Sequence, residues 1–125
     1  MKALIIDDED DIRLIAQLGL QASGLTVVVA MDGREGAELA REHQPDIIVL
    51  DWMMPGMDGR ATLAALRADA STARIPVVIL TAKNLASAED DLRGLGVVDF
   101  VSKPFAPREL VRRVKAALTR KSLPE

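Results

Sequence analysis

The chain has 125 residues, of which 49% are hydrophobic, and a formal net charge of −3. This length and composition indicate one globular domain with its own core, and the mild negative charge argues against general nucleic-acid binding. Apolar runs of about five residues are too short to span a membrane, which takes about 20; no secretory signal opens the chain, and the lack of cysteine excludes disulfides and fits a cytoplasmic protein.

The first predicted strand is the apolar run Ala3–Ile6, which stops at a run of acids, residues 7–11. The segment after it has the spacing of an amphipathic helix. Gly24 is predicted to end this helix, because glycine readily adopts the left-handed conformation found there. The predicted core stripe of the helix consists of Ile12, Ile15 and Ala16.

Four further apolar runs are rich in Val and Ile and do not alternate with polar residues, which predicts strands buried on both faces. They are Thr26–Ala30, Ile47–Leu50, Val77–Leu80 and Val97–Val101. The segments between them have helical spacing, and helix starts or ends are predicted at Asp32 with Glu35, Asp58 with Gly59, Ser87 with Asp90, and Gly96. Repeated strand–helix units favour a parallel sheet covered on both faces, which makes one α/β domain.

Polar residues follow the strands where the carboxyl ends of a parallel sheet gather functional groups. Asp7 and Asp8 follow the first run, Asp51 the third, Thr81 and Ala82 the fourth, and Ser102, Lys103 and Pro104 the fifth. We therefore expect three acids, a hydroxyl and a lysine on one edge of the sheet. A single acid at a strand end would be weak evidence, but this set predicts a functional site.

Three converging carboxylates need a cation or raised pKa values, since two like charges about 4 Å apart repel by about 4 kcal/mol at an effective dielectric constant of about 20. Oxygen ligands without His or Cys favour a hard ion such as Mg²⁺. An EF-hand fits poorly, because Arg13 stands where that loop needs glycine. Lys103 and Thr81 could hold phosphoryl oxygens. Taken alone, Lys103 is as readily explained as a lysine that extends into the solvent, and Thr81 as a hydroxyl that satisfies a strand end.

These motifs resemble the receiver domain of bacterial response regulators. They are Asp7-Asp8, the segment Asp51-Trp-Met-Met-Pro-Gly-Met-Asp-Gly59, Thr81-Ala82 and Lys103-Pro104-Phe105. The resemblance runs to about residue 119, which leaves 120–125 as a tail. It implies a flavodoxin-like, doubly wound (βα)5 fold with a five-stranded parallel sheet in the order 2-1-3-4-5.

The resemblance also implies a role for each acid. Asp51 corresponds to the phospho-acceptor, and Asp8 to a direct Mg²⁺ ligand. Asp7 corresponds to the acid that holds the ion mostly through water, and the backbone carbonyl of Met53 to the last protein ligand. Met53 and Lys83 stand where this family tunes phosphate loss. Neither side chain positions an attacking water well, so slow self-dephosphorylation is expected.

Lys103 and Thr81 resemble the residues that grip the phosphoryl group, and the small Ala82 leaves the approach open. The Lys103–Pro104 bond corresponds to one that is cis in such domains. Phe100 stands at the position of the switching aromatic, often a tyrosine, and its alternative role is ordinary core. In the switch that the resemblance implies, Thr81 would move toward the phosphate and Phe100 would fill the space that it leaves.

Leu14 and Leu18 fall on a flanking face of the first helix. Two such leucines most often widen the core; the alternative is a docking patch for the helical bundle of a kinase. The implied partners are a sensor histidine kinase or a histidine phosphotransfer protein and a downstream protein target. We expect no direct contact with nucleic acid or membrane, and a monomer or a weak dimer linked to phosphorylation.

The protein is therefore expected to be a signalling phospho-acceptor rather than an enzyme, either stand-alone or excised from a longer chain. A haloacid dehalogenase-type phosphatase shares several residues but places an aspartate where Met53 stands and carries a cap domain. A binding module on the same fold that works without phosphorylation is the third alternative; the intact acids and Lys103 argue against it.

Overall fold

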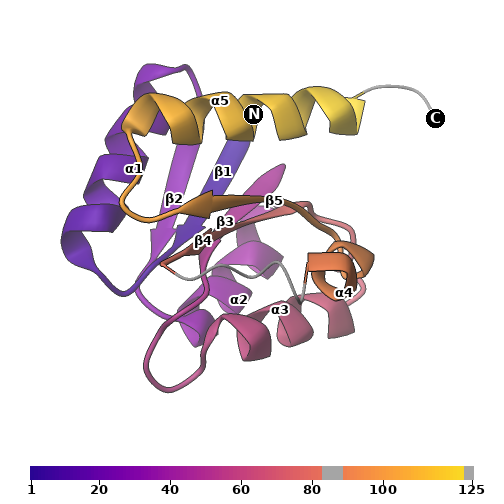
Figure 1. Cartoon of the computed structure of the whole chain (residues 1–125). Helices are drawn as coiled ribbons and strands as arrows, with labels where there is room; N and C mark the ends of the chain where they lie inside the picture. Colours follow the sequence, from indigo (N-terminus) through magenta and orange to yellow (C-terminus); the bar gives the residue numbers. More distant parts are fainter. Residues whose placement is uncertain (83–88, 123–125) are drawn as a thin grey trace.

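Strands and helices alternate along the whole of the described chain, residues 1–82 and 89–122 of a computed structural model (Figure 1). The strands form one parallel sheet in the order β2-β1-β3-β4-β5. The predicted fold class and strand order are therefore confirmed. The elements are β1 Lys2–Ile6, α1 Asp10–Ala22, β2 Thr26–Ala30, α2 Gly33–His43, β3 Ile47–Asp51, α3 Gly59–Ala68, β4 Val77–Thr81, α4 Glu89–Gly94, β5 Val97–Ser102 and α5 Pro107–Ser122.

Two hydrophobic layers cover the two faces of the sheet, because successive side chains of a strand point to opposite faces. Leu4 and Ile6 of β1 face the layer that α2, α3 and α4 close, whereas Ala3 and Ile5 face α1 and α5. Figure 1 shows α1 and α5 together on one face and the other helices on the opposite one. This two-sided burial explains why the strand sequences do not alternate with polar residues.

The central strands are buried as predicted, and the two edge strands, β2 and β5, are not. All residues of β3 and β4 are buried, whereas Val27–Val29 of β2 are only half-buried. In β5 the residues from Val98 to Phe100 are half-buried as well. For β2 and β5 the prediction of burial on both faces is therefore wrong, because each strand lies at a sheet edge and has a neighbour on one side only. Three strands run one residue further than predicted, to Asp51, Thr81 and Ser102, which fixes these three residues to the sheet.

The predicted helix boundaries rest on local hydrogen bonds. The Asp32 side chain accepts from the Glu35 N–H at 2.8 Å, and the Glu35 carboxylate accepts from the Met31 N–H at 2.8 Å. Asp58 caps α3 in the same way, through the Ala61 N–H. Gly24 and Gly96 have positive φ angles of 102° and 86° just beyond helix ends, where glycine has no steric penalty. The predicted cap residue Ser87 lies outside the described residues.

The core stripe predicted for α1 is partly wrong. Ala16 is fully buried and Ile12 packs against the core, but the Ile15 side chain is 41% exposed. Leu20 is the other fully buried residue of this helix. The helix is therefore rotated so that Ile15 lies at the boundary between the buried face and the solvent.

Arg67 joins the end of α3 to two turns on the amino-terminal side of the sheet. Its guanidinium donates to the carbonyl oxygens of Thr72 at 3.1 Å and Ile75 at 2.7 Å, in the α3–β4 connection. It also donates to the carbonyl of Leu95, in the turn before β5. Burial lowers the pKa of this arginine from its ordinary value. Arg67 therefore acts as a clasp between α3 and the α4–β5 turn.

The backbone of α5 continues to Ser122, three residues beyond the predicted domain end at 119. Of the helices that the structure describes, none is long and apolar enough to cross a membrane. The amino terminus of the chain lies away from the edge where β1, β3 and β4 end (Figure 1).

Candidate functional site: an acidic pocket at the sheet edge

The strand order reverses direction between β1 and β3, because β1 leads outward to β2 and β3 leads the other way to β4. Such a switch point leaves a crevice beyond the carboxyl ends of the two strands. Ile6 of β1 is in register with Leu50 of β3. The next residues of both strands, Asp7 and Asp51, therefore reach the crevice at the same level.

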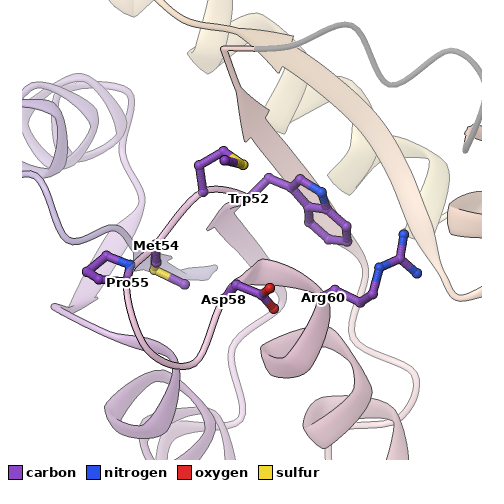
Figure 2. A pocket seen from close by; sticks show the side chains of 6 residues that line it. Trp52, Met54, Pro55, Asp58 and Arg60 are labelled. Atoms are coloured by element: carbon purple, nitrogen blue, oxygen red, sulfur yellow. The ribbon is translucent and has the colours of Figure 1, made fainter.

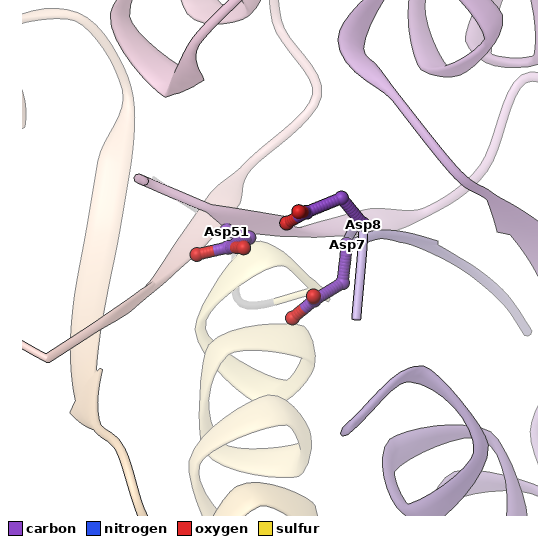
Figure 3. Close-up of side chains that lie close together, drawn as sticks. All are labelled: Asp7, Asp8 and Asp51. Atoms are coloured by element: carbon purple, nitrogen blue, oxygen red, sulfur yellow. The ribbon is translucent and has the colours of Figure 1, made fainter. Parts of the chain in front are cut away.

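Asp7, Asp8 and Asp51 point toward one another in this crevice (Figure 3). One carboxylate oxygen from each of the three lies within 4.8 Å of the others. Asp7 and Asp51 are buried, at 0% and 2% exposure. Asp8 Oδ1 and Asp51 Oδ2 are buried acceptors without a hydrogen-bond partner among the described residues. The convergence expected from the sequence is therefore present.

This donor set fits a hard divalent cation. All three ligand atoms are carboxylate oxygens, which suit Mg²⁺. Buried acceptors normally have a partner, and the two unpartnered oxygens would each gain one from a bound ion. The Met53 N–H donates to Asp51 Oδ1 at 3.2 Å, so the Met53 backbone runs beside the cluster.

Lys103 is paired with two acids of the cluster. Its Nζ lies 3.1 Å from Asp7 Oδ2 and 3.3 Å from Asp51 Oδ1. It also lies 3.1 Å from Glu9 Oε1. Burial alone would lower the pKa of Lys103, but its bonds to Asp7 and Glu9 and the nearby Asp51 charge raise that pKa above its ordinary value. The lysine therefore stays charged and balances part of the acidic cluster.

The pKa of Asp51 is raised to about 7. Burial is the largest cause, and the negative charge of Asp7 adds to it. The positive charge of Lys103 and the hydrogen bond from the Met53 N–H act in the opposite direction. Without a metal ion, the electrostatics of the pocket thus disfavour the charged form of this carboxyl.

Thr81 lies at the end of β4, on the strand next to Asp51, and is 3% exposed. Its carbonyl accepts from the Lys103 N–H at 2.8 Å, which ties the Lys103 segment to the β4 end. The Lys103–Pro104 peptide bond is cis, as the resemblance implies. Ala82 is exposed beside the pocket, and Lys83 lies outside the described residues.

Phe100 lies on β5, opposite Ile79 and two residues before the partner of Thr81. It therefore shares a sheet face with Thr81. Its ring packs only partly against the core, and the Arg93 guanidinium of α4 covers it at 5.4 Å from the ring centroid. Phe100 is thus only partly buried at the edge of the core, and its role as the switching aromatic stays a prediction.

A second hollow of about 400 Å³ opens beside the end of β3 (Figure 2). The Arg60 guanidinium lies 5.4 Å from the Trp52 ring centroid, an arrangement that favours a cation–π contact. The Met53 side chain is 53% exposed at its rim. The lining residues are Trp52, Met53, Met54, Pro55, Asp58 and Arg60.

Leu14 and Leu18 are exposed, by 52% and 56%. The prediction that they only widen the core is therefore wrong, and together with Ile15 they form an apolar patch on α1. Helix α1 starts three residues after Asp7. The patch therefore lies on the helix that leaves the acidic pocket.

Two residues of the pocket were missed in reasoning from the sequence. Glu9 contacts Lys103, and the Arg13 guanidinium donates to the Asp7 carbonyl at 2.8 Å. Glu9 belongs to the acidic run that the sequence displays, but its pairing with a lysine 94 residues away depends on the tertiary fold. The i, i+3 spacing of Asp10 and Arg13 was a local signal for their ion pair.

Solved structures with this architecture include the chemotaxis protein CheY4 of Vibrio cholerae, with a TM-score of 0.86 and 30% identity over 92% of this chain and 96% of that one. The receiver domain of the Francisella response regulator 1452 also gives a TM-score of 0.86, with 33% identity over 97% of this chain and 98% of that one. The fold and the pocket thus define a CheY-like signalling domain.

Residues 3–115 match the response regulator receiver domain family, and the chain belongs to this family. The phosphate regulon transcriptional regulatory protein PhoB of Klebsiella pneumoniae is 41% identical over 121 residues, which are 95% of this chain and 52% of that protein. The chain spans about half the length of the curated relatives that it matches. Receiver domains are signalling phospho-acceptors of two-component systems, and the family binds Mg²⁺ at an acidic pocket.

Proposed function

We propose that this receiver domain accepts a phosphoryl group on Asp51 from a phosphohistidine and switches a protein-interaction surface. The observation that carries the proposal is the crevice itself, in which three carboxylates and the Lys103 ammonium converge at the β1–β3 switch point. Phosphoryl transfer requires in-line positioning and charge neutralisation, with little covalent work by other side chains.

A bound Mg²⁺ would supply charge neutralisation for the carboxylates and the incoming phosphoryl oxygens. Asp8 would bind it directly, Asp7 mainly through water, and Asp51 and the Met53 carbonyl would complete the protein ligands. Neutralisation by the ion would favour the carboxylate form of Asp51, whose raised pKa otherwise disfavours it. Asp51 would then be available as the nucleophile.

Lys103 and Thr81 would bind the phosphoryl group once it is on Asp51. The ammonium already lies 3.3 Å from Asp51 Oδ1, so a small movement brings it to a phosphoryl oxygen. Thr81 ends the neighbouring strand, and Ala82 beside it leaves the pocket open to a donor. Movement of Thr81 toward the phosphate would leave space on the sheet face that Phe100 shares, and the surface of α4, β5 and α5 would change with it.

The decisive experiment is incubation with acetyl phosphate and Mg²⁺, followed by intact-mass measurement. Wild-type protein should gain the mass of one phosphoryl group, and Asp51→Asn should gain none, because an amide is not a nucleophile of this kind. EDTA should also abolish the gain. Equal labelling of wild type and Asp51→Asn would place the acceptor elsewhere.

The α1 patch is the proposed docking surface for the donor's helical bundle. It presents two leucines more than half exposed, on the helix that starts beside the pocket. Leu14→Ser with Leu18→Ser should slow transfer from a cognate donor protein at least severalfold, while labelling by acetyl phosphate stays unchanged. Unchanged transfer from the protein donor would rule out this surface.

Phosphate loss should be slow, because neither Met53 nor Lys83 offers a base that positions an attacking water. In a time course after donor removal, Met53→Asn should lose its label faster than wild type.

We further propose a cytoplasmic setting and a downstream protein target. Relatives about twice as long are named transcriptional regulators, so in a longer chain the target could be a further segment of the same protein.

A further inference from the structure

Lys103 has three negatively charged partners, and under the proposed function the phosphoryl group would be a fourth. Its Nζ lies 3.1 Å from Asp7, 3.1 Å from Glu9 and 3.3 Å from Asp51. An ammonium group has only three N–H donors. At least one carboxylate must therefore give up its bond when Lys103 turns to a phosphoryl oxygen.

Glu9 differs from the other two partners. It is not among the residues whose oxygens form the metal-binding cluster, so a bound cation would offset the charges of Asp7 and Asp51 more than that of Glu9. Its side chain is 59% exposed, whereas that of Lys103 is 11% exposed. Glu9 therefore lies at the rim of the pocket, outside the cluster that would hold the cation.

The Glu9 backbone is also fixed in place. Its N–H donates to Asp7 Oδ1 at 2.8 Å, and its carbonyl accepts from the Arg13 N–H at 2.9 Å in the first turn of α1. The carboxylate is thus held within reach of Lys103 by the same turn that presents Asp7 to the crevice.

We propose that Glu9 is a positioning and specificity-determining residue that tethers Lys103 at the rim and disfavours dianionic small phosphoryl donors. This inference rests on the proposed function of Asp51. With Glu9 in place, the Lys103 ammonium is paired both with Glu9 at the rim and with Asp7 and Asp51 in the crevice. A donor with two negative charges is then repelled by the Glu9 carboxylate at the rim of the pocket. A protein donor that docks on α1 gains binding free energy from that contact, which offsets the repulsion by Glu9.

The donor's charge provides the test. With acetyl phosphate, an Asp51 oxygen bonds to phosphorus, the P–O bond to acetate breaks, and acetate leaves with the electron pair. With zwitterionic phosphoramidate, the P–N bond breaks and neutral ammonia leaves, so neither reaction needs an added proton. Near pH 7.5 the first donor carries about two negative charges and the second about one.

Labelling rates at limiting donor should separate the variants. Glu9→Gln, which loses the charge but keeps an acceptor, should speed labelling by acetyl phosphate about fivefold, the size that one partly exposed ion pair allows. The gain with phosphoramidate should be smaller, and added salt should shrink the difference. Glu9→Asp, which keeps the charge but shortens the reach, should retain the wild-type ratio of the two donors. Asp11→Asn removes an equal charge in the same helical turn and should behave as wild type.

A second readout needs neither donor nor metal. In metal-free protein, the Lys103 side-chain ¹H–¹⁵N signal, assigned by its loss in Lys103→Arg, should shift in Glu9→Gln and Glu9→Asp but not in Asp11→Asn. The inference is overturned if the donor ratio of Glu9→Gln equals that of wild type, or if Asp11→Asn changes it equally. Wild type that takes no label from either donor would instead overturn the proposed function itself.

Discussion

At the scale of single residues, burial disfavours the charged form of Asp51. Its pKa is raised to about 7 by burial and by the charge of Asp7, against about 4 for an ordinary aspartate. Between these two values the folded, metal-free protein holds a proton on Asp51 that the unfolded chain has lost. The free energy of unfolding from this group is therefore greatest below pH 4 and falls as the pH rises to about 7.

Asp51→Asn should remove this pH dependence. In EDTA, wild type should lose stability relative to Asp51→Asn as the pH rises from 5 to 8, by a few kcal/mol at most, because one pKa unit corresponds to about 1.4 kcal/mol. Thermal unfolding of both proteins across this pH range measures the difference. A difference between their melting temperatures that stays constant with pH would contradict a raised Asp51 pKa.

Reasoning from the sequence located Asp7, Asp8, Asp51 and Lys103 because each follows an apolar run, and parallel strands end at one edge. It missed the contact between Glu9 and Lys103, since a rim carboxylate looks like any exposed acid until the fold sets the lysine beside it. The position of Ile15 was missed for a related reason. A helix face is set by packing against neighbours, and three apolar residues leave that face uncertain by tens of degrees.

At the scale of elements, the start of α3 packs directly against the end of β3. A Cβ added at Gly59 would lie 2.6 Å from the Trp52 Cα and 2.9 Å from the Asp51 carbonyl oxygen. Both neighbours are backbone atoms at the carboxyl end of β3, which cannot move without moving the acidic pocket. The close approach thus makes the position of α3 part of the geometry of the site.

Gly59→Ala should therefore destabilise the fold by about 1–3 kcal/mol, as overpacking does, and change the fluorescence of Trp52. Gly94→Ala is the matched control, because nothing lies within 4 Å of the added Cβ. In a helix, that change should be neutral or stabilising by up to about 1 kcal/mol. Chemical denaturation followed by tryptophan fluorescence compares the free energies of unfolding of the two variants. Equal losses would show that the flexibility of glycine, rather than packing at Gly59, determines the effect on stability.

The Arg67 clasp is a second link between elements that local sequence does not reveal, because its acceptors are carbonyls in two separate turns. Arg67→Lys should cost about 1–3 kcal/mol of unfolding free energy, since an ammonium cannot reproduce the planar fork and buried carbonyls lose their donors. Arg34→Lys, at a side chain 87% exposed, should cost almost nothing. A denaturation midpoint of Arg67→Lys equal to that of wild type would show that the clasp adds no stability.

At the scale of the whole molecule, the carboxylate cluster should link Mg²⁺ binding to global stability. An ion that binds only the folded chain stabilises it by about 2.7 kcal/mol at 100 times its dissociation constant. We expect Mg²⁺ to raise the melting temperature by several degrees, and Asp8→Asn to remove most of that gain. Asp11→Asn, outside the cluster, should keep the gain; its loss there would point to a general charge effect.

Helix α5 has a consequence for how the protein can be extended. It begins just after β5 reaches the pocket edge and runs back across the sheet, and its 16 residues cover about 24 Å. A five-residue strand covers about 17 Å, so the helix is long enough to reach the level at which the strands begin. A fluorescent reporter fused after Ser122 would therefore be attached on the side remote from the acidic pocket. It would neither block the access of a donor nor contact a phosphoryl group on Asp51.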